Sequence, residues 1–280
     1  MPDHFFKING IRLHLVHHPG KGPAIILLHG LTANAHAFDG LIAAGLCPAF
    51  NVYSVDLRGR GESDQPEDDY SMAAHAKDIT GILDALGIDK AIIGGHSFGA
   101  LLSLFIAANY PERVEKIILM DAAARMHSNT KEMLTPALGR LGQVFSSFDN
   151  YIEKVKAAPY LQFWDQEMLS YYQADVKNLD GSSVTPVPQL AHMLLAVNGA
   201  LAEPWTDYIH QIDKPAILIN GPEIYTMNAA LLPEENAMET VAMMKNCMYA
   251  KVPGNHQTML YGEGALEIVK EIKNFLNIHS

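Results

Sequence analysis

The stretch Gly95-His96-Ser97-Phe98-Gly99 places one serine among small residues. It follows an apolar run typical of a strand and precedes an apolar segment typical of a helix. Flanking glycines allow a sharp turn that lifts the serine hydroxyl above the sheet edge, where bulkier side chains would collide with strand and helix. The new helix also directs free amide groups at this place. The pattern therefore predicts that Ser97 is a nucleophile and that negative charge on a substrate oxygen is stabilised beside it.

Strand and helix patterns alternate on both sides of Ser97. Two short β-like runs flank Asn9-Gly10, the favoured two-residue hairpin turn. Continuous apolar runs, as in strands buried on both faces, cover 24–29, 51–57, 90–95, 114–121, 215–221 and 247–252. Helical spacing covers 71–87, 99–111, 235–245 and 265–276. This alternation predicts an α/β fold with a mostly parallel eight-stranded sheet flanked by helices.

The alternation stops near Ala122 and resumes near Lys214. The residues between are rich in methionine and aromatic side chains and lack a strand pattern. We expect a helical cap, 122–211, inserted after the sixth strand into a core of 1–121 and 212–280. Most of these side chains should pack the interior of the cap, and a minority should face a pocket. The candidates for binding substrate are Met126, His127, Tyr160, Trp164 and Met193.

These motifs resemble those of the α/β-hydrolase fold family, in the family's order along nearly all of the chain. The stretch "LLHGLTAN", 27–34, resembles the family's His-Gly loop after the third strand. The resemblance implies that the backbone amides of Leu31 and Phe98 form the oxyanion hole.

A serine is a poor nucleophile at its free pKa and needs a general base within hydrogen-bond reach. Among the 13 histidines, His256 follows a late strand and precedes the final helix. Its loop, "VPGNHQTML", resembles the family's histidine loop, and the order of serine before histidine fits. We therefore expect His256 to be the base.

The acid that orients the base is open between two carboxylates. Where the family usually has its aspartate, this sequence has Ile224, and Glu223 lies one residue earlier. Asp121, at the end of the 114–121 run, is the alternative, because some branches such as the haloalkane dehalogenases place the acid there. Either carboxylate would orient the imidazole and stabilise its protonated form.

The net charge of −11 disfavours nucleic acid and anionic membranes as partners. No apolar stretch reaches the roughly 18 residues of a membrane span. The N-terminus lacks the pattern of a signal peptide, so we expect a cytoplasmic protein. Cys47 and Cys247 are expected to be buried thiols. No metal or organic cofactor is expected, and a homodimer remains open.

The predicted function is a serine hydrolase of the carboxylesterase or lactonase kind. It would cleave a carboxylic ester or lactone of a small, largely apolar substrate through an acyl-enzyme. A carbon–carbon bond hydrolase and a hydroxynitrile lyase are alternatives on the same fold. A non-catalytic ligand-binding receptor is the alternative from another class, favoured only by the irregular position of the acid.

Overall fold

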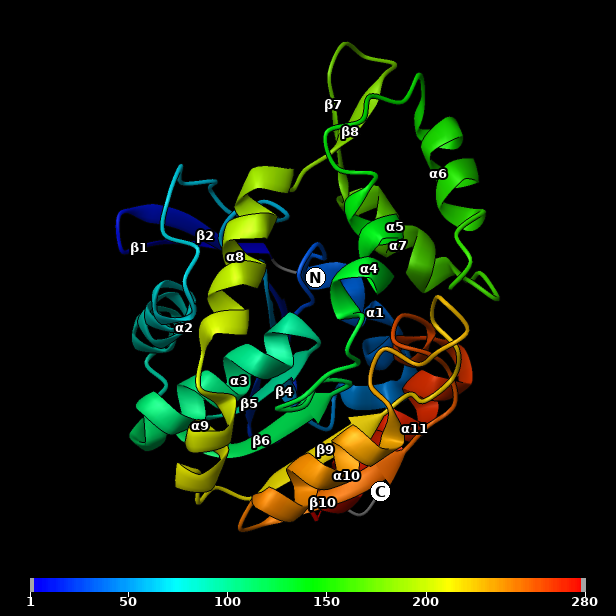
Figure 1. Cartoon of the computed structure of the whole chain (residues 1–280). Coiled ribbons are helices and arrows are strands. Elements are labelled where there is room, and N and C mark those ends of the chain that lie inside the picture. Colours follow the sequence, from blue (N-terminus) through cyan, green and yellow to red (C-terminus); the bar gives the residue numbers. More distant parts are fainter. Residues whose placement is uncertain (1–2, 278–280) are drawn as a thin grey trace.

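Eight strands form one mostly parallel sheet in the computed structural model, which describes residues 3–277 (Figure 1). Their order across the sheet is β1-β2-β4-β3-β5-β6-β9-β10. The strands are β1 (Asp3–Ile8), β2 (Ile11–His18), β3 (Ala24–Leu28), β4 (Asn51–Val55), β5 (Ala91–His96), β6 (Val114–Met120), β9 (Ala216–Asn220) and β10 (Cys247–Lys251). The predicted fold class is thus confirmed.

The antiparallel part of the sheet is confined to its N-terminal edge. β1 pairs with β2 around Asn9 and Gly10, whose φ angles of 50° and 86° form a tight two-residue turn. β2 also runs antiparallel to β4, and the remaining neighbours are parallel. Parallel pairs need crossover connections, which the helices supply.

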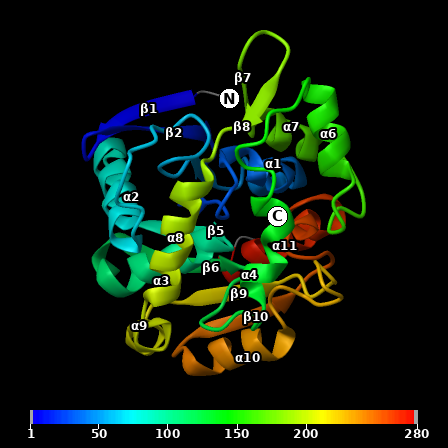
Figure 2. The ribbon, with the colours of Figure 1, turned by 45° about the horizontal axis from the view of Figure 1, so that its top comes forward.

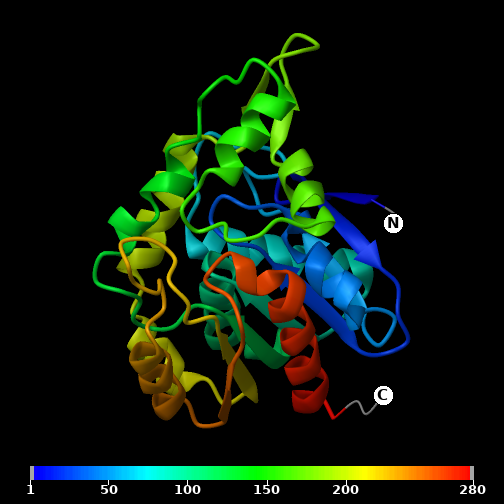
Figure 3. The same cartoon turned by 90° about the vertical axis from the view of Figure 1, so that its right-hand side faces the viewer.

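Helices cover both faces of the sheet. Alternate side chains of the central strands enter two separate apolar cores, so that Ile26 and Leu28 lie in one and Ile25 and Leu27 in the other. Side chains of α2, α3 and α10 fill the first core, and those of α1 and α11 fill the second (Figures 1 and 3). Their bounds are α1 (Asp39–Leu41), α2 (Met72–Leu86), α3 (Phe98–Asn109), α10 (Glu234–Met243) and α11 (Gly262–Phe275).

Residues 122–211 are here called the cap segment: most of it lies over the carboxyl ends of the strands, and residues 205–211 at its end pack beside α3 (Figures 1 and 3). Figure 2, which turns the top of the molecule toward the viewer, brings its helices α4 and α8 in front of the sheet. The segment contains α4 (Thr130–Met133), α5 (Thr135–Leu138), α6 (Phe148–Lys156), α7 (Gln166–Ala174), α8 (Leu190–Ala202) and α9 (Trp205–Gln211).

The expectation of a purely helical cap segment needs correction. β7 (Val176–Asn178) and β8 (Val184–Pro186) form an antiparallel hairpin within it. Strands of three residues are too short to give an alternating pattern in the sequence. The side chain of Asp180 holds the turn by accepting hydrogen bonds from the amides of Ser182 and Ser183.

The strand order brings separate parts of the chain to one edge. β3, β5, β6 and β9 are consecutive neighbours and all run in the same direction. The loops that follow these strands, and the loop after β10, therefore leave the sheet at the same end, beneath the cap segment.

Candidate active site

Ser97 occupies a strained turn between β5 and α3. Its φ and ψ are 55° and −119°, outside the regions that ordinary side chains prefer. The turn is tight because the flanking glycines touch backbone: a Cβ atom on Gly99 would lie 1.8 Å from the carbonyl oxygen of Leu28, and one on Gly95 would lie 2.1 Å from that of Gly99. Only glycine fits at these two positions, as expected for a turn that presents a hydroxyl above the sheet.

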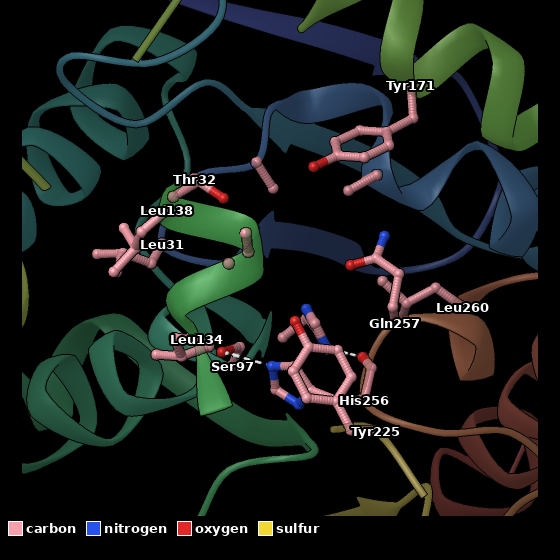
Figure 4. Close-up of a pocket in the computed structure, with 15 residues that line it drawn as sticks. Leu31, Thr32, Ser97, Leu134, Leu138, Tyr171, Tyr225, His256, Gln257 and Leu260 are labelled. Atoms are coloured by element: carbon pink, nitrogen blue, oxygen red, sulfur yellow. Dashed lines mark hydrogen bonds between the residues drawn. The ribbon is translucent and has the colours of Figure 1, made fainter. Parts of the chain in front are cut away.

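The hydroxyl of Ser97 is hydrogen-bonded to a histidine far along the chain. His256 Nε2 lies 3.0 Å from Ser97 Oγ, a contact drawn in Figure 4. His256 Nδ1 lies 2.7 Å from Asp121 Oδ2. With Nδ1 protonated and donating to the carboxylate, Nε2 is free to accept the serine proton. The arrangement can transfer a proton from Ser97 to the imidazole.

The carboxylate of Asp121 is held in place by contacts other than the imidazole. Asp121 follows β6 with φ 52° and is completely buried. Its Oδ1 accepts hydrogen bonds from Asn220 Nδ2 at 2.8 Å and from the amide of Gly221 at 2.9 Å. Donors on the oxygen that His256 does not use satisfy the buried carboxylate and keep it aimed at the ring.

Glu223, the other carboxylate that the sequence left open, faces elsewhere. Its side chain is exposed, and its Oε1 accepts a hydrogen bond from the amide of Gly254 at 2.9 Å. It thereby ties the loop after β9 to the loop that carries His256. Of the two carboxylates, the structure brings Asp121 to the imidazole.

The backbone of His256 is held by a second histidine. His96 Nε2 lies 2.7 Å from the carbonyl oxygen of His256, and the two rings approach to 4.6 Å between centroids. Burial lowers the pKa of His96 well below its usual value. His96 is therefore a neutral donor that anchors the base without adding a second positive charge.

The amides of Leu31 and Phe98 are candidate donors to a substrate oxygen. Phe98 is the first residue of α3, so its amide has no acceptor within the helix. The amide of Leu31 makes no backbone hydrogen bond in the described part of the chain. The opposite end of its peptide group, the carbonyl of Gly30, accepts from His29 Nδ1 at 2.8 Å and from the amide of Ala33 at 3.2 Å.

His29 sets the orientation of the Leu31 peptide group. Burial lowers the pKa of His29 to about 4, so the ring is neutral. Its Nε2 accepts a hydrogen bond from the amide of Leu57 at 3.0 Å, which leaves the proton on Nδ1 for the carbonyl of Gly30. Because the peptide is trans, fixing that carbonyl directs the amide of Leu31 the other way.

Two cavities meet at Ser97. The first, the narrow lobe, has a volume of about 50 Å³ and is bordered by His256 and by side chains of the cap segment and the strand-end loops (Figure 4). The second, the wide cavity, has a volume of about 410 Å³ and extends under α8 and α9. Leu31 and Leu134 border both of them.

The cap residues proposed from the sequence separate into two groups. Met126 and His127 line the wide cavity. Tyr160 stacks behind Tyr225, Trp164 stacks on Tyr172, and Met193 is completely buried in the core shared with α2 and α3. The last three line neither cavity at Ser97, which corrects the expectation for them: each is used in packing.

Sequence reasoning missed several residues that the structure brings to the site. Tyr171, Tyr225, Gln257 and Thr32 border the narrow lobe, and Trp205 borders the wide cavity. Thr32 and Gln257 lie within the two loop motifs quoted above, so their positions in those motifs were a usable signal. Tyr171 and Tyr225 reach the site through the fold alone.

Along residues 3–277, no three or more histidine, cysteine, aspartate or glutamate side chains gather in a way that could hold a metal ion. The same part of the chain contains no helix that is long and apolar enough to cross a membrane.

Comparison with known proteins identifies relatives over most of the chain. The sequence pattern of the family described as alpha/beta hydrolase fold matches residues 23–233. A 2-(acetamidomethylene)succinate hydrolase of Mesorhizobium japonicum is 28% identical over 240 residues, which cover 84% of each protein. An N-formylmaleamate deformylase of Pseudomonas putida is 40% identical over 114 residues, which cover 40% of this chain and 42% of the relative.

Solved structures agree with these matches. The crystal structure of E-2-(acetamidomethylene)succinate hydrolase superimposes with a TM-score of 0.86 at 25% identity and covers 99% of both chains. The similarity therefore extends through the sheet and the cap segment alike.

Proposed function

The chain belongs to the α/β-hydrolase fold family, and from this premise we propose that it is a serine hydrolase working through an acyl-enzyme. Its substrate is a carboxylic ester or lactone of a small, largely apolar molecule. The observation that carries the proposal is the hydrogen-bonded chain from Asp121 through His256 to Ser97, where two cavities meet.

The first half of the reaction forms the acyl-enzyme. His256 Nε2 takes the proton of Ser97 as the serine oxygen bonds to the substrate carbonyl carbon. The carbonyl oxygen becomes an oxyanion and accepts hydrogen bonds from the amides of Leu31 and Phe98. Asp121 stabilises the imidazolium that forms. When the tetrahedral intermediate collapses, the imidazolium gives its proton to the departing alcohol.

The second half repeats these steps with water. His256 takes a proton from a water molecule that attacks the acyl carbon, and the same two amides stabilise the second oxyanion. The imidazolium then returns its proton to Ser97 as the acid leaves. Each group thus serves both halves, and the protein ends in its starting state.

The side chains that line the wide cavity favour binding of an apolar acyl group. Side chains of Leu101, Met126, Val197, Trp205 and Leu231 form much of its wall. A polar edge of the cavity carries charged and hydroxyl side chains, namely Arg125, His127, Ser128, Thr130, Lys131 and Glu132. Burial of the apolar surface stabilises the acyl group by roughly 25 cal/mol per Å².

The division into a hydrolase core and a cap is part of the proposal. The core comprises 1–121 and 212–280 and supplies the acid, nucleophile and base. The cap, 122–211, supplies side chains of both cavities, among them Leu134 and Tyr171. In this division the core performs the chemistry and the cap selects the substrate.

Cleavage of an amide is a second candidate. The relative that aligns with 84% of this chain is named for hydrolysing 2-(acetamidomethylene)succinate, whose name contains an acetamido group. The same proton transfers would release an amine in place of an alcohol.

Hydrolysis of p-nitrophenyl acetate and butyrate tests the proposal. We expect release of p-nitrophenol by the purified protein and loss of at least about 10³-fold in kcat/KM for Ser97→Ala. Matched butyranilides distinguish the second candidate, which predicts cleavage of the amides at comparable rates. Undiminished turnover by Ser97→Ala would refute the assignment of the nucleophile.

A further inference from the structure

Four hydrogen-bonding side chains from different parts of the fold border the narrow lobe. Tyr171 belongs to α7, Tyr225 follows β9, Gln257 follows His256, and Thr32 follows β3. Figure 4 shows the hydroxyls of both tyrosines and the amide of Gln257 turned toward the space beside Ser97. Apart from Ser97 and His256, the other labelled residues of the lobe are leucines, so these four side chains supply polar groups beside the catalytic pair (Figure 4).

The two tyrosine hydroxyls lack protein partners. The Tyr171 and Tyr225 residues are each 3% exposed, and no hydrogen bond to either hydroxyl is found within residues 3–277. Burial raises the pKa of Tyr171 and that of Tyr225, so both remain neutral hydroxyls that can donate. Neither hydroxyl oxygen is among the fully enclosed, unpaired polar atoms of residues 3–277, so both are open to the lobe and can donate to an acceptor that enters it.

Contacts with Arg140 orient the hydroxyl of Thr32 so that it can donate a further hydrogen bond. Arg140 Nη1 donates to Thr32 Oγ1 at 3.3 Å, and Arg140 Nη2 donates to the carbonyl of Thr32 at 3.1 Å. With a lone pair of Oγ1 occupied by the guanidinium, the hydroxyl proton of Thr32 remains for another acceptor. The guanidinium itself is paired with Asp175 through two hydrogen bonds of 3.0 and 3.1 Å. Among residues 3–277, the lining of the lobe therefore presents hydrogen-bond donors and no lysine or arginine side chain.

The position of His256 indicates which part of the substrate, the acyl group or the leaving group, occupies the narrow lobe. His256 borders the narrow lobe and is absent from the walls of the wide cavity. The imidazolium must reach the leaving atom to protonate it. The leaving group therefore lies in the narrow lobe, and the acyl group extends into the wide cavity.

The size of the narrow lobe limits what it takes. Its volume of about 50 Å³ corresponds to roughly three or four water positions. A leaving group of about two to five non-hydrogen atoms fits within the lobe, and a larger one, such as the p-nitrophenyl group of the activated esters, extends beyond it.

We propose that the narrow lobe is a leaving-group subsite that selects a small alcohol or amine carrying an acceptor oxygen, held by the hydroxyls of Tyr171 and Tyr225 and by Gln257. This inference rests on the proposed function, and it names the polar half of the substrate. A hydrocarbon leaving group of the same size displaces water from these hydroxyls without pairing with them, and is discriminated against.

Three esters of butyric acid test the proposal: propyl butyrate, 2-hydroxyethyl butyrate and carboxymethyl butyrate. All three give the same butyryl-enzyme, so differences in kcat/KM arise while the leaving group is still bound. We expect the wild-type protein to prefer at least one oxygen-bearing ester over the propyl ester by about tenfold or more. Preference for the carboxymethyl ester means that the lobe takes a carboxylate, and preference for the 2-hydroxyethyl ester means that it takes a neutral oxygen.

Conservative variants connect that preference to the two hydroxyls. Tyr171→Phe and Tyr225→Phe should each lower it about fivefold, because kcat/KM should fall further for the oxygen-bearing ester than for propyl butyrate. Tyr172→Phe is the matched control, because this neighbouring buried tyrosine does not border the lobe, and it should keep the wild-type preference.

Equal cleavage of all three esters by the wild-type protein would overturn the subsite and leave the proposed function standing. Equal losses on the propyl and the oxygen-bearing esters in Tyr171→Phe and Tyr225→Phe would also overturn it. If no ester is cleaved and Ser97 does not react with a fluorophosphonate, the proposed function fails and the subsite fails with it.

Discussion

Asp121 contacts the imidazole of His256 through one carboxylate oxygen and is held by two amide donors through the other. These contacts of the two carboxylate oxygens give His256 a fixed tautomer and a nearby negative charge when it accepts the proton of Ser97. The argument for a non-catalytic receptor rested on the irregular position of the acid. A buried carboxylate 2.7 Å from the imidazole removes that argument.

Two isosteric substitutions test which carboxylate serves the base. Asp121→Asn keeps the shape of the side chain but loses the charge and favours the wrong tautomer of His256, so kcat should fall by about 10³- to 10⁴-fold. Glu223→Gln should change kcat less than about threefold, because its carboxylate faces the amide of Gly254. Steady-state kinetics on p-nitrophenyl butyrate, with circular dichroism to check folding, measures both. The opposite ranking would mean that the imidazole turns to Glu223 in solution.

The sequence predicts the nucleophile Ser97 and the base His256 of this site, but it does not decide which carboxylate contacts the base. Ser97 and His256 lie in short motifs whose glycines and order along the chain indicate their roles. The choice between Asp121 and Glu223 depends on which strand end approaches the imidazole. That distance follows from the sheet order β5-β6-β9 and from the turn at Pro222, neither of which is fixed by local sequence.

At the scale of single elements, the turn between β5 and α3 depends on two close backbone approaches. Gly99→Ala places a Cβ atom 1.8 Å from the carbonyl oxygen of Leu28, so β3 or α3 must shift. We expect the free energy of unfolding to fall by about 3 kcal/mol or more and activity to be lost. Gly199→Ala in α8 is the matched control, because its nearest neighbour is 3.7 Å away, and it should stabilise by about 0.5–1 kcal/mol. Urea unfolding of the two variants measures the contrast, and equal effects would contradict it.

A buried ion pair links the cap segment to the loop that carries Leu31. Arg140 contacts Asp175 and also the backbone of Thr32. Arg140→Met leaves the carboxylate of Asp175 buried without its cation and should destabilise the protein by about 3–5 kcal/mol. The double variant Arg140→Met/Asp175→Leu removes both charges and should recover most of that loss. Additive losses, measured by urea unfolding, would show that the pair does not act as a unit.

Core elements and cap elements differ in how well the sequence predicts them. The strands and helices of the core follow continuous apolar runs and helical spacing, and all of the expected ones are present within a few residues. The β7–β8 hairpin was missed because its strands are short. Tyr160, Trp164 and Met193 could not be assigned to pocket or packing, since an aromatic or methionine side chain has the same pattern in either place.

At the scale of the whole molecule, stability should depend on four buried neutral histidines. Burial lowers the pKa of His18 and that of His29 to about 4, and lowers those of His75 and His96 well below the usual value. Unfolding lets each imidazole bind a proton once the pH falls below about 6.5. The stabilisation is therefore complete above about pH 6.5 and is lost as the pH falls toward 4. Four such groups together give a slope of roughly 5 kcal/mol per pH unit.

Urea unfolding at about pH 7 and about pH 5.5 measures this slope. The pKa of His36, which hydrogen-bonds Asp39, and that of His14, whose burial is outweighed by its hydrogen bond to Asp56, are raised. These two groups therefore add stability as the pH falls from about 7 toward about 6 and oppose the slope there, and below about pH 6 they are protonated in both states and add little. An unfolding free energy that stays constant over this range would contradict the neutral state of the buried imidazoles.

The most direct test of the central claim is to locate the nucleophile with a fluorophosphonate probe. The account predicts that the probe modifies a single peptide, that the modified residue is Ser97, and that Ser97→Ala remains unlabelled. His256→Ala should react at least about 10³-fold more slowly, because the hydroxyl loses its base. An unmodified Ser97 in the folded protein, or labelling that persists unchanged in His256→Ala, would contradict the account.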